Sequence, residues 1–466
     1  MKPRAPLPPG PYLVVGLARS GVAAALALRR SDPSARISAC DAGRPPEALA
    51  EAERLAAAGV EVHLDTDGSE ALAAPEPPKT IVKSPGVPAG APVVAAAREQ
   101  GLTVMGELEL GWRLVPNEFV AVTGTNGKTT TTELIGAIHR AAGLPVAIAG
   151  NVGTPVSSYA REGALEPDSE AASVMVCEAS SFQLEDSLEF APEAAVFLNF
   201  ADDHLDRHGD ARSYLEAKLR IFTNQSGDDV AVLNADEPAL RDATLGGEAR
   251  RIWFGTAREC ELRLAGEVLT WGGSELMPAS DVRLRGAHNL SNAMAAAATA
   301  LARDVDPDSV RSALAEFAGV PHRVEEVARV GGVLYVNDSK ATNVAAAAAS
   351  LQAFGIGVHV ILGGRSKGTG FDELVPAVAE ACRRCYLIGE AAERLRRDLA
   401  PSGVELLDCG DLERAVAEAA AAARPGETVL LAPACSSFDQ YRDFEERGEH
   451  FRSLVARLER GAEASA

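Results

Sequence analysis

The sequence lacks any uninterrupted apolar run long enough to cross a bilayer, and its first ten residues hold no apolar core of the kind that a signal peptide needs. Positive charge is scarce as well, because 45 Lys and Arg stand against 66 Asp and Glu, a formal net charge of −21. Such an acidic surface argues against nucleic acid or an anionic membrane as a partner. If the substrates are anions, cationic side chains must gather where those substrates bind.

Paired cysteines are missing too. Seven cysteines, an odd number, are scattered along the chain, which fits a reducing cytoplasm rather than a disulfide framework. Cys382 and Cys385 form one CxxC pair, but no second pair completes a zinc site. Zinc or redox use of this pair stays open, and we favour structural cysteines at a helix-to-strand junction.

The length of 466 residues predicts about three domains, and 47% hydrophobic residues provide material for several cores. Three blocks begin with strand-like runs and then alternate with helical segments, a pattern typical of parallel sheets with helices on their faces. We predict three α/β domains: an N-terminal Rossmann-like domain over 1–106, a central P-loop ATPase-like domain over 107–319 and a C-terminal Rossmann-like domain over 320–466. The expected strands cover 12–16, 37–40, 80–82, 119–122, 145–149, 173–177, 194–200, 229–233, 333–336, 359–362, 385–388 and 428–431.

The most informative motif follows the apolar run 119–122. It reads Gly124-Thr-Asn-Gly127-Lys128-Thr129 and precedes a segment compatible with a helix. Strand, glycine loop and helix in this order form a phosphate cradle, because backbone N–H groups turn inward and the helix directs its positive end at the anion. The alternative is a glycine turn before an ordinary amphipathic helix. We infer that the chain binds ATP.

A second glycine turn, Gly16-Leu-Ala-Arg-Ser-Gly21, follows the first strand, and a helix is expected from about Val22. Ala18 replaces the middle glycine of a dinucleotide fingerprint, which weakens a NAD site and leaves room for a nucleotide diphosphate. The Ser84-Pro-Gly86 loop follows another strand, at the edge where open α/β sheets bind ligands. This loop is either a ligand loop or a surface turn.

Acidic side chains follow two strands of the central block. Glu178 is either a magnesium ligand or an ordinary loop acid. The stretch 202–208 is crowded with carboxylates and imidazoles, which suits Mg²⁺ binding or proton handling, or else a solvated turn with a helix cap.

Spacing alone would leave Lys218, on the amphipathic segment 214–222, facing solvent. The amides of 286–292 either read an adenine edge or cap the next helix.

The third block supplies the missing cations. Strand ends are expected to deliver Asp338, Lys340, Thr342 and Lys367 to one edge of a sheet, an anion-binding rim on an acidic protein. The last strand leads to Ser436 and Ser437, which we expect to start a helix whose N-terminus can hold a carboxylate.

Taken together, these motifs resemble the Mur ligases, the ATP-dependent amino-acid-adding enzymes of peptidoglycan synthesis, over nearly the whole chain. The glycine loop 124–129 and His-Asn at 288–289 are shared across that family. The segments 178–185, 337–343 and 433–440 look like its D-glutamate-adding branch. No Asp-Asn-Pro-Arg motif of the diaminopimelate-adding branch is present.

The resemblance implies roles for single residues in ATP and metal binding. Residues implied for ATP are Gly124, Thr125, Asn126, Gly127, Lys128, Thr129, Thr130, Asn292, Arg323 and Asp338. The implied catalytic residues are Lys128, His204 and Lys218. Two magnesium ions are implied, one held by Thr129 with Glu178 and one by His204 with Lys218. The resemblance also implies a carbamylated Lys218, which turns a cation repelled by Mg²⁺ into an oxygen ligand.

Two further substrates are implied. The implied contacts of UDP-N-acetylmuramoyl-L-alanine are Ser20, Asp41, Ser84, Gly86 and Asn151. Those of D-glutamate are Lys340, Thr342, Lys367, Ser437 and Phe444. Two departures affect these sites: Asp41 is followed by Ala-Gly-Arg rather than Thr-Arg, and Phe438 stands where a smaller aliphatic residue is expected.

The implied reaction is acid–amino-acid ligation through an acyl phosphate, giving ADP and phosphate. We expect a cytoplasmic monomer that neither binds nucleic acid nor inserts into a membrane. Alternatives are a ligase for another amino acid on the same precursor, a glutamate ligase acting on folate, and a nucleotide-binding scaffold without catalysis. Against the scaffold stand the residues with chemical roles, namely Lys128, Glu178, His204, Lys218, Lys340 and Lys367.

Overall fold

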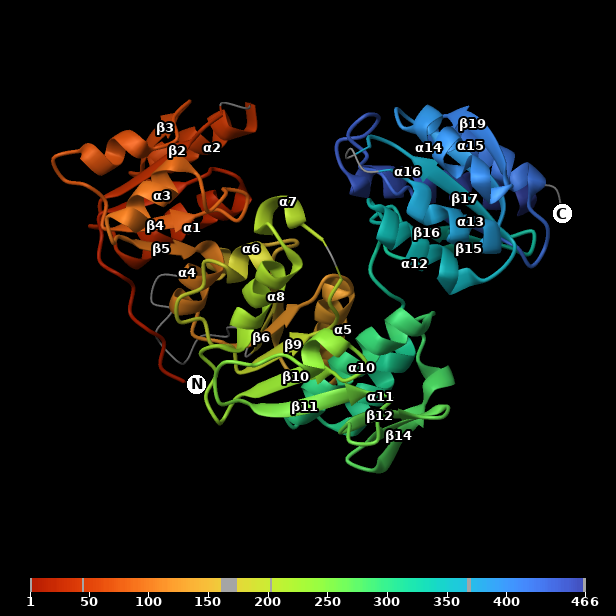
Figure 1. Cartoon of the computed structure of the whole chain (residues 1–466), viewed down its shortest axis with the longest axis horizontal. Coiled ribbons are helices and arrows are strands. Elements are labelled where there is room, and N and C mark those ends of the chain that lie inside the picture. Colours follow the sequence, from red (N-terminus) through yellow and green to blue (C-terminus); the bar gives the residue numbers. More distant parts are fainter. Residues whose placement is uncertain (1, 44–45, 161–173, 202, 367–369, 464–466) are drawn as a thin grey trace. The chain divides into compact units, whose positions relative to one another are not determined.

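The computed structural model describes residues 2–43, 46–160, 174–201, 203–366 and 370–463. Its strands form three sheets, and the chain divides into two compact units (Figure 1). One unit comprises 1–282 and 291–316, and the other comprises 283–290 and 317–466. The first two sheets belong to the first unit and the third sheet to the second.

The first sheet is fully parallel, in the order β3-β2-β1-β4-β5. Its strands are β1 Tyr12–Val15, β2 Ile37–Asp41, β3 Glu61–Leu64, β4 Thr80–Lys83 and β5 Thr103–Gly106. The helices of this region are α1 Arg19–Ser31, α2 Pro46–Ala57, α3 Pro92–Glu99 and α4 Glu107–Leu114. Apolar side chains pack on both faces of the sheet, so its central strands are buried. Open α/β sheets of this kind bind ligands outside the carboxyl ends of their strands.

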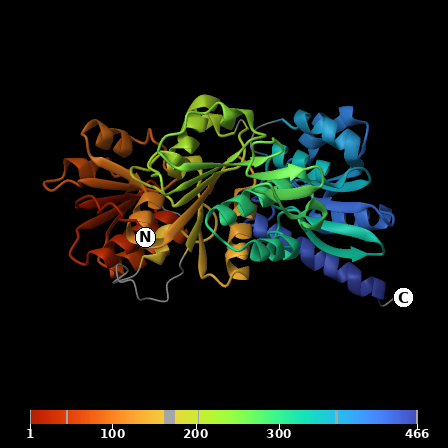
Figure 2. The same ribbon diagram turned by 90° about the horizontal axis from the view of Figure 1, so that it is seen from below.

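The second sheet has nine strands in the order β14-β13-β12-β11-β10-β9-β6-β8-β7. Several of them are visible as yellow-green and green arrows in Figure 2. The strands are β6 Glu118–Thr123, β7 Val146–Gly150, β8 Val174–Glu178, β9 Ala194–Phe197, β10 Val230–Asn234, β11 Arg250–Gly255, β12 Leu262–Ala265, β13 Val268–Trp271 and β14 Ser274–Pro278. The helices are α5 Lys128–Ala141, α6 Ser181–Leu184, α7 Leu205–His208, α8 Ala211–Leu219, α9 Pro238–Arg241, α10 Ala287–Ala302 and α11 Pro307–Glu316. In this order β6 lies between β8 and β9, so the turns that follow these three strands meet at one edge.

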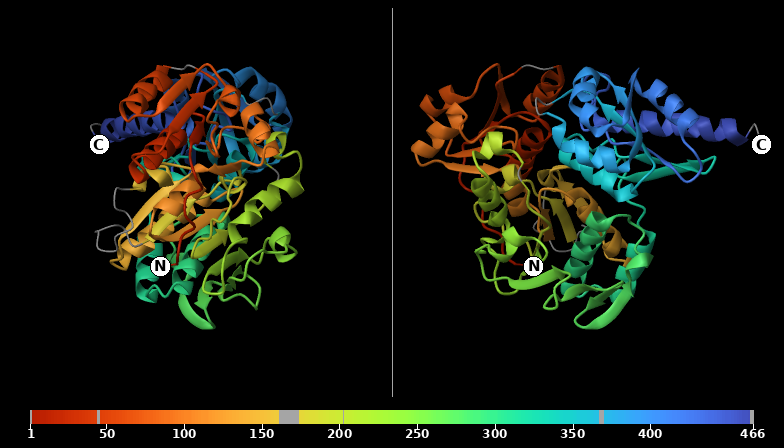
Figure 3. Two further views of the ribbon diagram at one scale, coloured as in Figure 1. Left: turned by 90° about the vertical axis from the view of Figure 1, so that its left-hand side faces the viewer. Right: turned by 45° about the vertical axis from the view of Figure 1, so that its right-hand side comes forward.

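The third sheet runs β15-β16-β20-β17-β18-β19. Its strands are β15 Glu325–Val330, β16 Val333–Asn337, β17 Val358–Gly363, β18 Cys382–Ile388, β19 Glu405–Gly410 and β20 Thr428–Leu431. The helices are α12 Val344–Phe354, α13 Val375–Ala381, α14 Ala392–Leu399, α15 Leu412–Ala422 and α16 Phe444–Glu463. The long helix α16 packs on β15, β16 and α15 (Figure 3).

The predicted architecture of three α/β sheets is confirmed, but the sheets are not parallel throughout. Strands β12, β13 and β14 pair antiparallel, and so do β15 and β16, because short glycine turns such as Gly331-Gly332 return the chain directly. Helix α1 begins at Arg19 rather than near Val22. Cys382 and Cys385 lie where α13 passes into β18, as expected, and all seven cysteines are free. The domain limits at 106/107 and 319/320 stay predictions.

Across the described ranges, none of the helices combines the length and the apolar character that spanning a membrane requires.

Candidate active site

The phosphate loop, residues Gly124–Thr129, turns between β6 and α5 on two glycines in the positive-φ region. Gly124 has φ 149° and Gly127, the N-cap of α5, has φ 83°. A Cβ added at Gly127 would lie 2.1 Å from Oδ1 of Asn292, so only glycine admits that side chain. The structure therefore brings Asn292 from α10 against the loop on which the ATP phosphates were predicted to lie.

The ammonium of Lys128 folds over this loop. Its Nζ donates to the carbonyl oxygens of Gly124 at 3.1 Å and Thr125 at 2.9 Å. The loop is also anchored at its outer side, since the backbone N–H of Thr125 donates to Asn199 and that of Asn126 to the Asn199 side chain. A cation therefore lies on a fixed turn of backbone, an arrangement that can accept an anionic phosphate.

Thr129 and Glu178 meet although 49 positions separate them in the sequence. The Thr129 hydroxyl donates to Oε2 of Glu178 at 2.7 Å, and Nδ2 of Asn151 donates to its Oε1 at 3.1 Å. Glu178 is the last residue of β8 and is 3% exposed. Hydroxyl and carboxylate oxygens are the ligands that Mg²⁺ prefers, so this pair fits the first of the two predicted magnesium sites. Asn151, predicted for the UDP substrate, lies here beside the carboxylate.

Lys218 is buried at 1% exposure, so the expectation from spacing that it faces solvent is wrong. Its Nζ donates to the Gly124 carbonyl at 2.8 Å and lies 4.6 Å from the centroid of the Tyr214 ring. Burial, and next the positive charge of Lys128, lower the pKa of Lys218 to about 6. The physical reason is tertiary: the amine lies beneath the phosphate loop, where desolvation disfavours the ammonium form.

His204 lies in a different setting from Lys218. It has φ 52°, its side chain is 48% exposed, and its ring lies 4.8 Å from that of Phe182 and 6.2 Å from that of Tyr214. Within the described part of the chain no cluster of three or more His, Cys, Asp or Glu side chains is arranged to hold a metal. An imidazole and an unmodified amine do not make an oxygen-rich Mg²⁺ site. Asp202, from the same stretch, lies outside the described residues.

The first glycine turn, Gly16–Gly21, is fixed by two side chains. Oδ2 of Asp41 accepts the Leu17 N–H at 2.7 Å, and the Ser84 hydroxyl donates to the Gly16 carbonyl at 2.8 Å. Of the other predicted UDP contacts, Ser20 is half-buried at the start of α1, and a Cβ added at Gly86 would meet nothing within 4 Å. Asp41 and Ser84, which were predicted to contact the UDP substrate, thus hold the conformation of the turn through hydrogen bonds.

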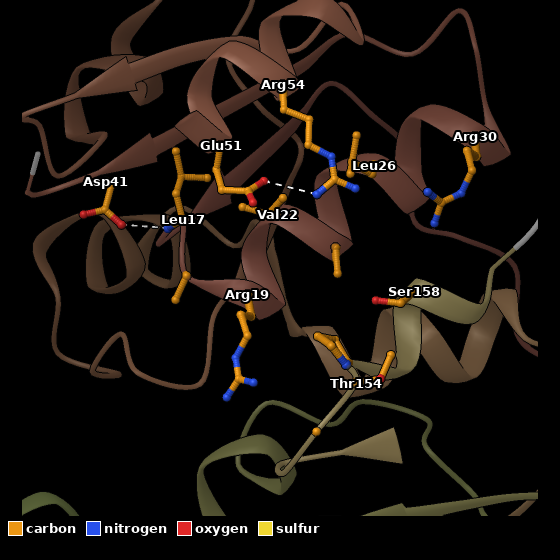
Figure 4. Close-up of a pocket in the computed structure, with 14 residues that line it drawn as sticks. Leu17, Arg19, Val22, Leu26, Arg30, Asp41, Glu51, Arg54, Thr154 and Ser158 are labelled. Carbon is orange, nitrogen blue, oxygen red and sulfur yellow. Dashed lines mark hydrogen bonds and ion pairs between the residues drawn. The ribbon is translucent and has the colours of Figure 1, made fainter. Parts of the chain in front are cut away.

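A cavity of about 710 Å³ adjoins this turn, and Asp41 lines it (Figure 4). Sequence reasoning missed its cationic residues, because arginines on helices carry no motif. The guanidinium groups that line it belong to Arg19, Arg30 and Arg54. Arg54 pairs with Glu51 at 3.3 Å. The opposite wall includes Thr154 and Ser158, from the segment that follows β7.

In the second unit, the predicted rim lies where β16, β20 and β17 end. Asp338 directly follows β16 and is buried. Burial raises the pKa of Asp338. The hydrogen bond that it accepts from the Ser350 hydroxyl and the positive charge of Arg323 both act to lower this pKa. Nζ of Lys340 lies 3.9 Å from the Phe444 ring centroid, and Ser437 is 2% exposed.

One prediction about the rim is wrong, and another concerns a residue that is not described. Ser436 and Ser437 do not start a helix, because α16 begins at Phe444 and Ser436 instead pairs with Arg365 across an isolated bridge. Lys367 lies outside the described residues.

The segment 286–292 was predicted to precede a helix, but α10 already begins at Ala287. Within it, Nδ2 of Asn289 donates to the Arg285 carbonyl at 2.9 Å.

Two protein-family profiles match this chain. The family profile described as Mur ligase middle domain matches residues 122–300, and that of the Mur ligase, glutamate ligase domain matches 322–435. The chain is 42% identical to the UDP-N-acetylmuramoylalanine–D-glutamate ligase of Acidobacterium capsulatum, over 97% of either chain. It is 40% identical to the protein of that name from Koribacter versatilis, over 96% of this chain and 97% of the relative.

Among solved structures, the chain is similar to the UDP-N-acetylmuramate–alanine ligase of Thermotoga maritima. The TM-score is 0.58, with 96% of this chain and 99% of that chain covered. A pseudomurein peptide ligase type C from Methanothermus fervidus gives a TM-score of 0.55 over the same shares. Both are 18% identical to this chain, a likeness that concerns the fold alone.

Proposed function

Because the chain belongs to the Mur ligase family, we propose that it is the ATP-dependent ligase that adds D-glutamate to UDP-N-acetylmuramoyl-L-alanine in peptidoglycan precursor synthesis. The observation that carries the proposal is the phosphate loop with Lys128 folded over it and the Thr129–Glu178 pair, 2.7 Å apart, at its end. The relatives that carry this name match the chain over nearly their full length, and this supports D-glutamate as the amino acid.

The proposed reaction has two steps. An oxygen of the substrate carboxylate attacks the γ-phosphorus of ATP, the bond to the ADP oxygen breaks, and an acyl phosphate forms. The amine of D-glutamate then attacks the acyl carbon, and phosphate leaves from a tetrahedral intermediate as the amine loses a proton. Lys128 binds the β- and γ-phosphate oxygens and offsets charge on the transferred group, so its contribution is positioning and electrostatics.

Thr129 and Glu178 are the residues that would hold a magnesium ion, which supplies further neutralisation of phosphate charge when bound. The proposal of a second magnesium ion requires a carbamylated Lys218 beside His204, since the unmodified pair does not fit a Mg²⁺ site. The buried amine that donates to the Gly124 carbonyl supports the modification, because a neutral amine reacts with CO₂ and an ammonium does not. A carbamate carbon signal after incubation with ¹³C-bicarbonate, absent in Lys218→Met, is the expected result.

Substrate contacts are proposed for the remaining site residues. Gly124–Thr130, Asn292, Arg323 and Asp338 bind ATP; Ser20, Asp41, Ser84, Gly86 and Asn151 bind the UDP substrate; Lys340, Thr342, Lys367, Ser437 and Phe444 bind D-glutamate. The three predicted domains, 1–106, 107–319 and 320–466, would each carry one of these roles mainly. We further propose a monomer that works in the cytoplasm, where ATP is available, and sedimentation of the full chain tests its mass.

The deciding experiment measures phosphate release from ATP with UDP-N-acetylmuramoyl-L-alanine and one amino acid at a time. Release with D-glutamate, and little with L-glutamate, L-alanine or diaminopimelate, is expected. A preference for another amino acid would identify a different branch of the family. Release with a folate in place of the UDP substrate would identify the folate alternative.

A further inference from the structure

Arg447, in the first turns of α16, is among the largest fully buried side chains of the described residues, at 1% exposure. Its guanidinium binds neutral oxygens. Nε donates to the Ser339 hydroxyl at 3.0 Å, and Nη2 donates to the carbonyls of Ser339 at 2.9 Å and Cys435 at 3.2 Å. Nη1 lies 3.4 Å from the Gly363 carbonyl. One side chain thus bridges three segments far apart in the sequence.

Ser339 and Cys435 lie shortly after β16 and β20, and Gly363 is the last residue of β17. The three strands are neighbours in the sheet and run parallel. Their loops therefore meet at one carboxyl edge, the rim predicted to hold the amino acid. Ser339 precedes Lys340, and Cys435 stands two residues before Ser437. The planar fork of a guanidinium fixes the directions of its partners, so Arg447 sets the relative positions of the loops that carry these two residues.

The loops also hold one another through their backbones. The Gly363 N–H donates to the Pro433 carbonyl at 2.9 Å, and the Ala434 N–H donates to the Ala341 carbonyl at 2.9 Å. The Ser339 hydroxyl in turn donates to the Phe444 carbonyl at 2.8 Å, which ties the start of α16 to the same edge. Because Arg447 binds the same loops, a substitution of Arg447 is expected to shift all three of them.

The hydrogen-bond partners of the Arg447 guanidinium among the described residues are a hydroxyl and carbonyl oxygens, and the charge of Asp439 acts on it only from a distance. Burial lowers the pKa of Arg447 to about 10, which still leaves the group charged at neutral pH. Burial disfavours such a cation more than the charge of Asp439 favours it, since the pKa of Arg447 is lowered on balance. An anion bound at the same edge would offset this penalty, and an amino acid with two carboxylates is such an anion.

We infer that Arg447 is a positioning residue for the amino-acid substrate: its hydrogen bonds align the three rim loops, and its buried positive charge favours carboxylates at the rim. The inference rests on the proposed function, which places D-glutamate at this edge. Arg447 does not touch the substrate in this role. Its effect is therefore expected in the binding of one substrate rather than in all three.

The test uses the full-length enzyme with Arg447→Gln and Arg447→Lys. The control is Arg457→Gln, which removes an exposed pair with Glu413 on the same helix. We expect Arg447→Gln to raise the KM for D-glutamate at least tenfold, with the KM for ATP and for the UDP substrate within twofold of the wild type. Arg447→Lys keeps the charge but not the planar fork, so it should recover part of this loss. Arg457→Gln should change none of the three.

Two results would overturn the inference. One is an unchanged KM for D-glutamate with only kcat and Tm lowered, the signature of fewer folded molecules. The other is an equal rise in the KM of all three substrates. If Arg447→Gln does not fold, Arg447→Lys decides by the same criteria.

Wild-type turnover tests the proposed function separately. If the wild type prefers another amino acid, the proposed function fails, and the KM for that amino acid then tests Arg447. If no amino acid supports turnover, both fail.

Discussion

The first glycine turn and the phosphate loop have the same local construction but opposite electrostatic surroundings. Each follows a central parallel strand, begins at a glycine with positive φ (Gly16 at 88° and Gly124 at 149°) and leads into a helix. An anion holds the first turn, because the Asp41 carboxylate accepts the Leu17 N–H. A cation holds the second, because the ammonium group of Lys128 donates to the Gly124 carbonyl, as does the buried amine of Lys218.

The difference teaches that a strand–glycine–helix turn specifies a shape and not a chemistry. A backbone N–H that a carboxylate already accepts is not offered to a phosphate, whereas a loop covered by the Lys128 ammonium attracts one. The first turn suits a substrate bound in the adjoining cavity, and the second suits a phosphoryl group in reaction. Four changes test this division, from the largest expected effect to the smallest.

Replacing Lys128 with Met removes the cation that lies on the phosphate loop. We expect kcat to fall by about 10²- to 10³-fold, the range observed when one preorganised charge-stabilising group is removed. The KM for the UDP substrate should stay within twofold, since the first turn is untouched. Phosphate release measures both. Lys79→Met, at an exposed lysine beside β4, is the control, and a loss below tenfold for Lys128→Met would contradict the assignment.

Lys218 should make stability depend on pH. Its pKa in the folded chain, about 6, lies below its ordinary value of 10.5. The unfolded chain therefore binds one more proton between these pH values, and the free energy of unfolding rises with pH across that window. The slope is at most about 1.4 kcal/mol per pH unit for one proton. Urea unfolding at pH 7, 8 and 9 should show this rise in the wild type and lose it in Lys218→Met.

Equal slopes in the two proteins would mean that the amine is charged in the folded state or solvated there. Lys79→Met again serves as the control, because an exposed lysine should leave the slope unchanged.

Replacing Asp41 with Asn tests the anion that holds the first turn. The carboxylate accepts the N–H groups of both Leu17 and Gly43, at 2.7 and 2.9 Å, and an amide has only one acceptor oxygen. Losing one charge-assisted bond should raise the KM for the UDP substrate roughly tenfold, with kcat little changed. Asp32→Asn, at the other end of α1, is the matched control. A fall in kcat with an unchanged KM would oppose the comparison.

Replacing Ser84 with Ala should have the smallest effect. The change removes the hydroxyl that donates to the Gly16 carbonyl at 2.8 Å in a site 4% exposed. We expect about 1 kcal/mol of stability to be lost, the usual contribution of one hydrogen bond, and a KM for the UDP substrate raised less than fivefold. Thermal unfolding and steady-state kinetics measure these, with the exposed Ser34→Ala as control. A larger loss of activity than in Asp41→Asn would reverse the order proposed here.

Sequence reasoning located the central strands well, because buried parallel strands are continuous apolar runs. It missed eight strands, namely β3, β5, β11, β12, β13, β14, β15 and β19. Among these, β3 alternates between exposed and half-buried residues, and β12–β14 are short hairpin strands. Such strands are stabilised by pairing with neighbours rather than by their own composition. The expected helix start at Ser436 failed for a related reason, since that serine pairs with Arg365 of another loop.

The sequence by itself determined the phosphate loop, because Gly124 to Thr129 are contiguous and their backbone conformations and side chains act within one turn. It also located the acids and cations at strand ends, since strands and their ends are local features. Only the tertiary structure decided that Lys218 is buried under the loop, that Glu178 meets Thr129, that arginines line the cavity and that Arg447 joins three loops. Burial and desolvation depend on segments far apart in the chain, and no local pattern records which of them will pack together.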